Sequence, residues 1–296
     1  MIVGIFLGLT AATFQSLSYL FTRWFVTTYD RSAVPLLIMG HILMGTLSLA
    51  ALPFLWPSSM PPPLSYLPAL AQATLFYLIG QSALTITLQR TQASRLAPLL
   101  GTKVLVLAMI SMVFYDTVLS ANQWFAVLLS VTAATLLSRI GGAISPGALA
   151  GIAIACIGYS LSDINIRRLV LTFTDLSLAH ATSLGVCLIY LISGGIALFG
   201  ISRKYTRTMW VHAVPYALSW FAGMFFLFGT FATIGVVYGN IVQSSRGLIS
   251  IVLGVVVARA GFVTVEQHAG AGTTIRRTTA AILMITAIVL FYLGKR

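Results

Sequence analysis

Apolar stretches of about twenty residues follow one another along almost the whole chain, and this repetition limits the folds open to it. Separated by proline, glycine and charged residues, they lie at 2–22, 33–56, 65–88, 93–115, 120–138, 147–166, 177–200, 210–234, 238–258 and 275–293. A helix needs roughly 20 mainly apolar residues to cross the hydrocarbon core of a bilayer. The pattern therefore predicts an all-α integral membrane protein with ten transmembrane helices.

Composition argues against a soluble fold. Of the 296 residues 58% are hydrophobic and only 7% are charged, whereas soluble domains carry about 25% charged residues. The net charge of +12 would suggest nucleic-acid binding in a soluble protein. Here the basic residues stand singly or in pairs between apolar runs, where such charges orient membrane helices. We therefore expect no nucleic-acid partner.

The sequence offers no motif for catalysis or for a bound cofactor. Cys156 and Cys187 lie inside apolar runs, and the four histidines do not cluster with cysteine or carboxylate residues. Neither a disulfide framework nor a metal site is expected from them. Nucleotide-binding, nucleophile-elbow and zinc-protease motifs are missing from the sequence. The prediction is that the protein is not an enzyme and has no cofactor.

The two halves of the chain resemble each other. Ser16-Leu17-Ser18 followed by Arg23 recurs as Ser160-Leu161-Ser162 followed by Arg167, at the same internal spacing. Two further matches keep the same order: Leu75 to Gly80 with Met224 to Gly229, and Thr132 to Ala134 with Thr279 to Ala281. A unit with five crossings ends on the side opposite to its start, so a second copy enters the membrane upside down. We therefore expect two inverted five-helix repeats, 1–140 and 147–296, joined by a glycine-rich linker over 139–147.

Four short segments carry a family resemblance: Ala93 to Pro98, Tyr115-Asp116, Ile241 to Leu248, and Glu266. They are similar to segments of the ten-helix EamA-type permeases of the drug/metabolite transporter (DMT) superfamily, and the likeness spans essentially the full length. The resemblance implies a secondary transporter. Asp116 and Glu266 only approximate the family's Leu-Gly-Glu breaks, and the tryptophan frequent in helices 1 and 6 appears as Gln15 and Tyr159. Because the latter changes fall where a substrate would be recognised, the resemblance does not identify the substrate class.

Two cations lie well inside predicted helices. Lys103 is near the middle of the fourth, roughly 15 Å from its start at 1.5 Å per residue, and Arg246 lies about eight residues into the ninth. Their repeat counterparts are Val252 and Ala97, so duplication does not explain them. Relatives that carry phosphorylated sugars hold their anions with basic residues on the same two helices, which implies an anionic or zwitterionic substrate. The alternative is that both cations cap helix ends or reach the membrane surface.

Asp163 is the one acidic residue inside a predicted helix. It shares a helix face with Tyr159 and Ser162, opposite in the repeat to Gln15 and Tyr19. An ionisable group in a membrane helix costs about 2.5 to 3.5 kcal/mol on insertion scales, so it usually faces a cavity or a partner. Asp163 is predicted either to exchange protons or to reach water or Arg167, four residues further on.

Further polar and aromatic residues inside the spans complete the predicted site. His41 is expected either to exchange a proton near neutral pH or to form a hydrogen bond between helices. Tyr77 and Trp220 either line a cavity or belong to the interfacial aromatic belt, and Gln243 either binds substrate or helps helices associate. The predicted substrate-binding set is Gln15, Tyr19, His41, Tyr77, Lys103, Tyr159, Ser162, Asp163, Trp220, Gln243 and Arg246.

These features predict a secondary active transporter that moves a small polar metabolite, an anion or an amino-acid-like molecule, as an exporter or exchanger. Its partners would be that substrate, a coupling ion such as H+ or a counter-substrate, and the lipid of a bacterial inner membrane, where it would act as a monomer or homodimer. One alternative is a proton-coupled efflux pump for cationic drugs that uses Asp163. Another is a non-transporting membrane subunit or lipid-handling protein.

The orientation in the membrane is left open by two opposing indications. Arg and Lys are more frequent in the loops after odd-numbered predicted helices, which places both termini outside by the positive-inside rule. Ten-helix relatives usually have both termini inside. Both indications agree that the two termini lie on the same side.

Overall fold

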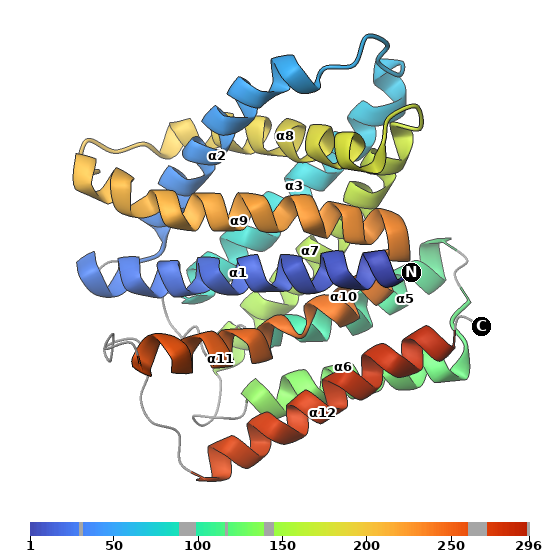
Figure 1. Cartoon of the computed structure of the whole chain (residues 1–296). Coiled ribbons are helices and arrows are strands. Elements are labelled where there is room, and N and C mark those ends of the chain that lie inside the picture. The colour runs from blue at the N-terminus through green and yellow to red at the C-terminus, as the bar shows by residue number, and fades with distance from the viewer. Residues whose placement is uncertain (30–31, 89–98, 116–117, 139–144, 260–270, 295–296) are drawn as a thin grey trace.

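The computed structural model describes the chain apart from residues 30–31, 89–98, 116–117, 139–144, 260–270 and 295–296, and the described part contains helices and no strand (Figure 1). The helices are α1 (Ile2–Tyr29), α2 (Val34–Leu55), α3 (Pro63–Leu88), η1 (Leu100–Thr102), α5 (Lys103–Tyr115), α6 (Ala121–Ser138), α7 (Pro146–Thr172), α8 (Leu178–Ala197), η2 (Leu198–Gly200), α9 (Arg207–Ile234), α10 (Val236–Gln243), α11 (Arg246–Arg259) and α12 (Ala271–Leu293). The predicted all-α fold is confirmed.

Six segments in the described part of the chain are long and apolar enough to cross a bilayer: Ile2–Tyr29, Val34–Leu55, Pro63–Thr87, Pro146–Thr172, Leu178–Gly200 and Arg207–Ile234. Three shorter apolar helices accompany them, at Leu100–Phe114, Ala121–Leu136 and Thr278–Leu293. The chain is an integral, multi-pass membrane protein. The total of ten crossings stays a prediction.

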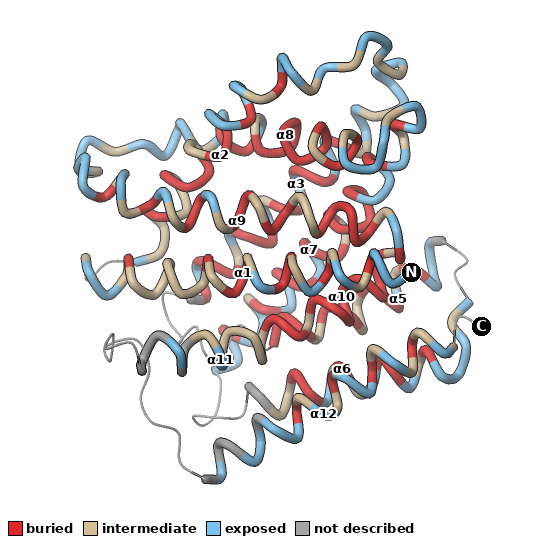
Figure 2. Tube along the Cα trace, in the orientation of Figure 1, coloured by how far each residue is buried: buried red, intermediate tan, exposed pale blue. Residues whose placement is uncertain are grey.

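The outside of the bundle is apolar, and part of its inside is charged. Large apolar side chains such as Phe6, Phe54 and Phe114 are exposed, whereas Lys103 and Asp163 are buried. Figure 2 shows exposed residues along the outward faces of α2, α6 and α12 and buried ones along α7, α8 and α10. This distribution is the reverse of that in a soluble protein. It suits a bundle whose solvent is lipid, because ionisable groups there face the interior.

The most extensive contacts join helices from different halves of the chain. They pair α3 with α7, α1 with α9, α2 with α8, and α6 with α12, and the α6–α12 pair forms one edge of the bundle in Figure 1. Glycines permit the closest crossings: a Cβ added to Gly45 of α2 would lie 2.9 Å from the Cα of Gly194 in α8. A Cβ added to Gly158 of α7 would lie 2.8 Å from the backbone nitrogen of Gly80 in α3. Close backbone packing of this kind supplies much of the attraction between helices in lipid.

The ninth predicted span is two helices, because α10 ends at Gln243 and α11 begins at Arg246. Ser244 Oγ donates to the carbonyl of Asn240 at 2.8 Å, and Ser245 Oγ donates to that of Val242 at 2.7 Å. Hydroxyls that bond back to carbonyls of their own helix compete with its hydrogen-bond ladder and bend it. Arg246 is the first residue of α11, and the prediction that it lies about eight residues into one continuous helix is wrong.

Lys103 directly follows the 3-10 turn η1 and is the first residue of α5, within the apolar helical segment Leu100–Phe114. Residues 89–98, which precede this segment, lie outside the described residues, so the place of Lys103 near the middle of a longer helix stays a prediction. Thr102 Oγ1 donates to the carbonyl of Leu99 at 2.6 Å within this turn. Hydropathy does not register such hydroxyl bonds, because they leave the apolar character of the segment unchanged.

Candidate functional site

Polar and charged side chains are buried where α1, α5, α7, α10 and α11 meet. The Nζ of Lys103 lies 3.0 Å from Oδ2 of Asp163, and the amide nitrogen of Asn240 donates to the same oxygen at 2.9 Å. Lys103 is 7% exposed and Asp163 is 4% exposed. Burying a single charge costs several kcal/mol unless it is paired and hydrogen-bonded. The pair satisfies that requirement for one cation and one carboxylate.

Arg246 makes the second set of contacts in this region. Its Nη1 donates to Oε1 of Gln15 at 3.1 Å, and Nε2 of Gln243 donates to the same oxygen at 2.7 Å. The guanidinium carbon lies 5.6 Å from the centre of the Tyr19 ring, within cation–π range. Arg246 is 8% exposed and forms no ion pair with any carboxylate in the described part of the chain. Its positive charge is hydrogen-bonded but not neutralised there.

The two sets form one site. Asn240 and Gln243, both on α10, connect the two sets, because Asn240 donates to Asp163 and Gln243 donates to Gln15. Nζ of Lys103 also lies 5.6 Å from the centre of the Tyr159 ring. We call the following residues the charged group: Gln15, Tyr19, Lys103, Tyr159, Asp163, Asn240, Gln243 and Arg246. Among the residues described, it contains two cations and one carboxylate, and an anion is the ligand that would complement it.

The position of Asp163 differs from what the sequence suggested. The predicted span 147–166 placed Asp163 in the last turns of its helix, but α7 continues to Thr172, so Asp163 is well inside it. Arg167, the partner considered for it, instead donates from Nε to the carbonyl of Phe231 at 3.1 Å. The alternative of an Asp163–Arg167 pair is therefore wrong. The observed partner, Lys103, lies on another helix.

A second set of buried polar side chains, the aromatic chain, consists of His41, Tyr77, Tyr190 and Trp220. The indole nitrogen of Trp220 donates to the Tyr190 hydroxyl at 2.6 Å, and that hydroxyl donates to the Tyr77 oxygen at 3.3 Å. Nε2 of His41 lies 2.9 Å from the Tyr77 oxygen, and its Nδ1 lies 2.8 Å from the carbonyl of Leu37. A carbonyl only accepts, so Nδ1 carries the proton and Nε2 accepts from Tyr77. The hydrogen bond between helices that was one alternative for His41 is present.

The aromatic chain adjoins the charged group. The rings of Trp220 and Tyr19 are 6.2 Å apart, and those of Tyr77 and Tyr159 are 6.4 Å apart, between centroids. The Tyr159 hydroxyl donates to Oε1 of Gln81. Aromatic rings of the two sets are therefore neighbours in the interior of the bundle.

The structure brings most of the predicted set together. Seven of its residues belong to the charged group, which are Gln15, Tyr19, Lys103, Tyr159, Asp163, Gln243 and Arg246, and three belong to the aromatic chain, which are His41, Tyr77 and Trp220. Ser162 is in neither, because its hydroxyl donates to the carbonyl of Ala73 on α3 at 2.9 Å. The sequence set omitted Asn240 and Tyr190. Asn240 stands three residues before Gln243, and this helical spacing was the signal available for it.

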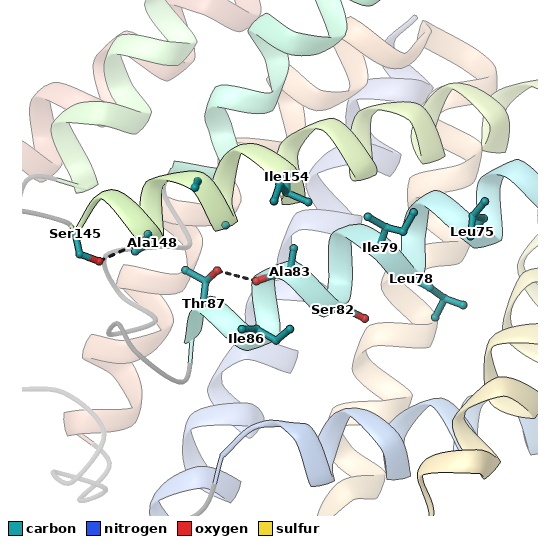
Figure 3. A pocket seen from close by; sticks show the side chains of 13 residues that line it. Leu75, Leu78, Ile79, Ser82, Ala83, Ile86, Thr87, Ser145, Ala148 and Ile154 are labelled. Atoms are coloured by element: carbon teal, nitrogen blue, oxygen red, sulfur yellow. Dashed lines mark hydrogen bonds between the residues drawn. The ribbon is translucent and has the colours of Figure 1, made fainter.

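An apolar groove lies elsewhere, between α3 and α7. Figure 3 shows Leu75, Ile79 and Ile86 on α3 and Ile154 on α7 among the residues that line it, with Thr87 bonded to the carbonyl of Ala83. The groove measures about 670 Å3, and none of its lining residues is charged. It opens on the outer surface of the bundle, so it does not provide a site for a polar metabolite.

Buried charged side chains in the interior of a helical membrane bundle are typical of transporters and other functional membrane proteins. Residues 2–139 match the model of the EamA-like transporter family. This part of the chain is similar to that family, which lies within the DMT superfamily and whose members are transporters rather than enzymes. The predicted resemblance is confirmed over residues 2–139. Of the segments that suggested it, Ala93 to Pro98, Asp116 and Glu266 lie outside the described residues, as does most of the 139–147 linker.

One solved structure, titled only "Crystal structure of protein", resembles the whole fold. It has a TM-score of 0.71 and 15% sequence identity, and the similarity covers 97% of this chain and 95% of that one. At this identity the likeness shows the fold alone. No curated protein matches the sequence.

Proposed function

We propose that this protein is a secondary active transporter that moves a small organic anion across the membrane by alternating access. The observation that supports this substrate is the surplus positive charge of the charged group, where Lys103 is paired with Asp163 and Arg246 has no carboxylate partner among the described residues. A buried charge without a counter-charge is costly. An anion bound beside Arg246 would remove that cost, so the site favours anions over neutral or cationic solutes.

The packing of the helices supports two exchangeable halves, 1–140 and 147–296. If the halves are interchanged, the α1–α9 contact maps onto the α7–α3 contact. The α2–α8 and α6–α12 contacts each map onto themselves. Contacts related in this way are expected of inverted five-helix repeats, whose two halves can exchange conformations and open a central site to either side in turn. The protein would act as an exporter or exchanger in a bacterial inner membrane.

The proposal for a cationic substrate is weaker on these contacts. The carboxylate of Asp163 already accepts from Lys103 and from Asn240, so it is engaged rather than free to hold a cation. A cationic drug would also add to the existing surplus of positive charge. The family similarity favours transport over a non-transporting membrane subunit.

Counterflow into proteoliposomes tests the proposal. The purified protein is first screened against organic metabolites by thermal stabilisation, and the most stabilising anion is then used as the labelled solute. Arg246→Gln should reduce its uptake by about a hundredfold or more, as expected when a buried charge-assisted contact of 3 kcal/mol or so is lost. Arg203→Gln, which removes an exposed cation before α9, is the matched control. Equal uptake by Arg246→Gln and wild type would refute the proposal.

A further inference from the structure

Two residues on α1 correspond to two residues on α7. Gln15 and Tyr159 are 144 positions apart, and so are Tyr19 and Asp163. The repeated Ser-Leu-Ser triplets at 16–18 and 160–162 have the same separation. The two pairs therefore occupy equivalent turns of equivalent helices.

Each of these pairs holds one cation. On α1, Arg246 donates to Gln15 and covers the ring of Tyr19. On α7, Lys103 covers the ring of Tyr159 and forms an ion pair with Asp163. The two cations are thus each other's counterparts in the site. The structural equivalence of Lys103 and Arg246 replaces the alignment of the two halves of the sequence, which matched Lys103 with Val252 and Arg246 with Ala97.

The two halves of the site differ in charge. Asp163 on α7 is equivalent to Tyr19 on α1, so Lys103 contacts a carboxylate and Arg246 contacts an aromatic ring instead. Two cations and one carboxylate leave the described charged group with a single surplus positive charge. A ligand with one negative charge would make the buried group neutral, whereas a doubly charged anion would overshoot and a zwitterion would leave the surplus in place. Because uncompensated charge is costly inside a membrane protein, the single charge is favoured.

Two amide oxygens of the charged group have no hydrogen-bond partner in the described structure. They are Oδ1 of Asn240 and Oε1 of Gln243, both buried and three residues apart on α10. The amide nitrogens of these residues are already used, toward Asp163 and Gln15, which fixes the oxygens as the free ends. Buried acceptors are nearly always paired. A hydroxyl on the ligand would provide the missing donor.

We infer that the transported solute is a small hydroxylated organic acid with a single net negative charge. Arg246 holds its anionic group, Asn240 or Gln243 accepts from its hydroxyl, and Asp163 sets the charge limit by neutralising Lys103. This inference rests on the proposed anion transport and narrows its substrate class.

Five three-carbon probes of similar size separate charge from hydrogen bonding: glycerate, tartronate, serine, glycerol and propionate. Thermal stabilisation of the full-length protein against probe concentration yields an apparent affinity for each. For wild type we expect glycerate to bind about tenfold more tightly than the doubly charged tartronate, the zwitterion serine and the neutral glycerol. Propionate, which carries the charge without a hydroxyl, should also be weaker than glycerate.

Variants at Asp163 test whether it sets the charge limit. Asp163→Asn is nearly isosteric and raises the surplus to two positive charges, so tartronate should overtake glycerate by on the order of tenfold. The double variant Lys103→Gln with Asp163→Asn removes a neutral pair, and its order of preference should match wild type. Asp175→Asn, which removes an exposed acid between α7 and α8, is the control. Size-exclusion profiles and melting without probe verify that each variant is folded.

The outcomes are distinct. Three results would overturn the inference. The wild type could prefer tartronate or serine, Asp163→Asn could leave the order of probe affinities unchanged, or none of the five probes could stabilise the protein. Equal affinity for propionate and glycerate would overturn the role of the hydroxyl. In each of these cases the proposed function survives if another anion shows counterflow that Arg246→Gln abolishes. If Asp163→Asn does not fold, the wild-type probe order and the double variant still decide the matter.

Discussion

The charged group and the aromatic chain are both buried and polar, yet they differ in how completely their members are satisfied. In the aromatic chain each donor has an acceptor, from Trp220 through Tyr190 and Tyr77 to His41 and a backbone carbonyl. The charged group holds a surplus cation and two unpartnered amide oxygens among the described residues. A complete network holds helices together, whereas an incomplete one is suited to receive a ligand. The difference indicates which region binds and which supports.

The largest effect on folding should follow from breaking the ion pair of the charged group. Lys103→Met leaves Asp163 buried without its cation, and this should lower the free energy of unfolding by about 3 to 5 kcal/mol. Adding Asp163→Leu should restore much of the loss, because the charge and its partner are then both absent. Unfolding in mixed micelles with increasing SDS measures both variants. If the double variant is no more stable than the single one, the pair is not what holds these helices.

A smaller loss should follow from opening the aromatic chain. Tyr190→Phe keeps the ring but removes the acceptor for Trp220 and the donor to Tyr77, and the free energy of unfolding should fall by about 1 to 2 kcal/mol. Transport of the anion should stay within a few-fold of wild type, because no charge has changed. The same micelle titration and the counterflow assay provide the two readouts. Loss of transport without loss of stability would place the aromatic chain in the binding site and remove the contrast drawn above.

The smallest effect concerns the half-buried ring beside Arg246. Tyr19→Leu removes the cation–π contact and should weaken anion binding by about 0.5 to 1 kcal/mol, which is a few-fold in apparent affinity. Tyr19→Phe keeps the ring face and should bind almost as wild type does. Thermal stabilisation against anion concentration compares the two. If Phe is as damaging as Leu, the hydroxyl and not the ring is the important part.

Hydropathy was sufficient to predict most of the helices and many of the buried polar residues. Helices α2, α3, α6 and α8 begin and end within a few residues of their apolar runs. The break between α10 and α11 was not predictable in this way, because it leaves the apolar character of the segment unchanged. The neighbouring Ser244 and Ser245 were the visible signal for it.

That this chain is a helical membrane protein follows from its sequence, because a lipid environment requires long apolar helices and each such stretch can be recognised along the sequence. The sequence also identified Lys103, Asp163 and Arg246 as ionisable residues within apolar segments, where a charge is costly unless it has a partner or faces a cavity. Which of the buried residues contact each other depends on the three-dimensional packing of the helices. The pairing of Lys103 with Asp163, 60 positions away, and of Arg246 with Gln15, 231 positions away, depends on how each helix is rotated about its axis. That rotation is set by packing between helices such as the Gly45–Gly194 crossing, which no local pattern contains.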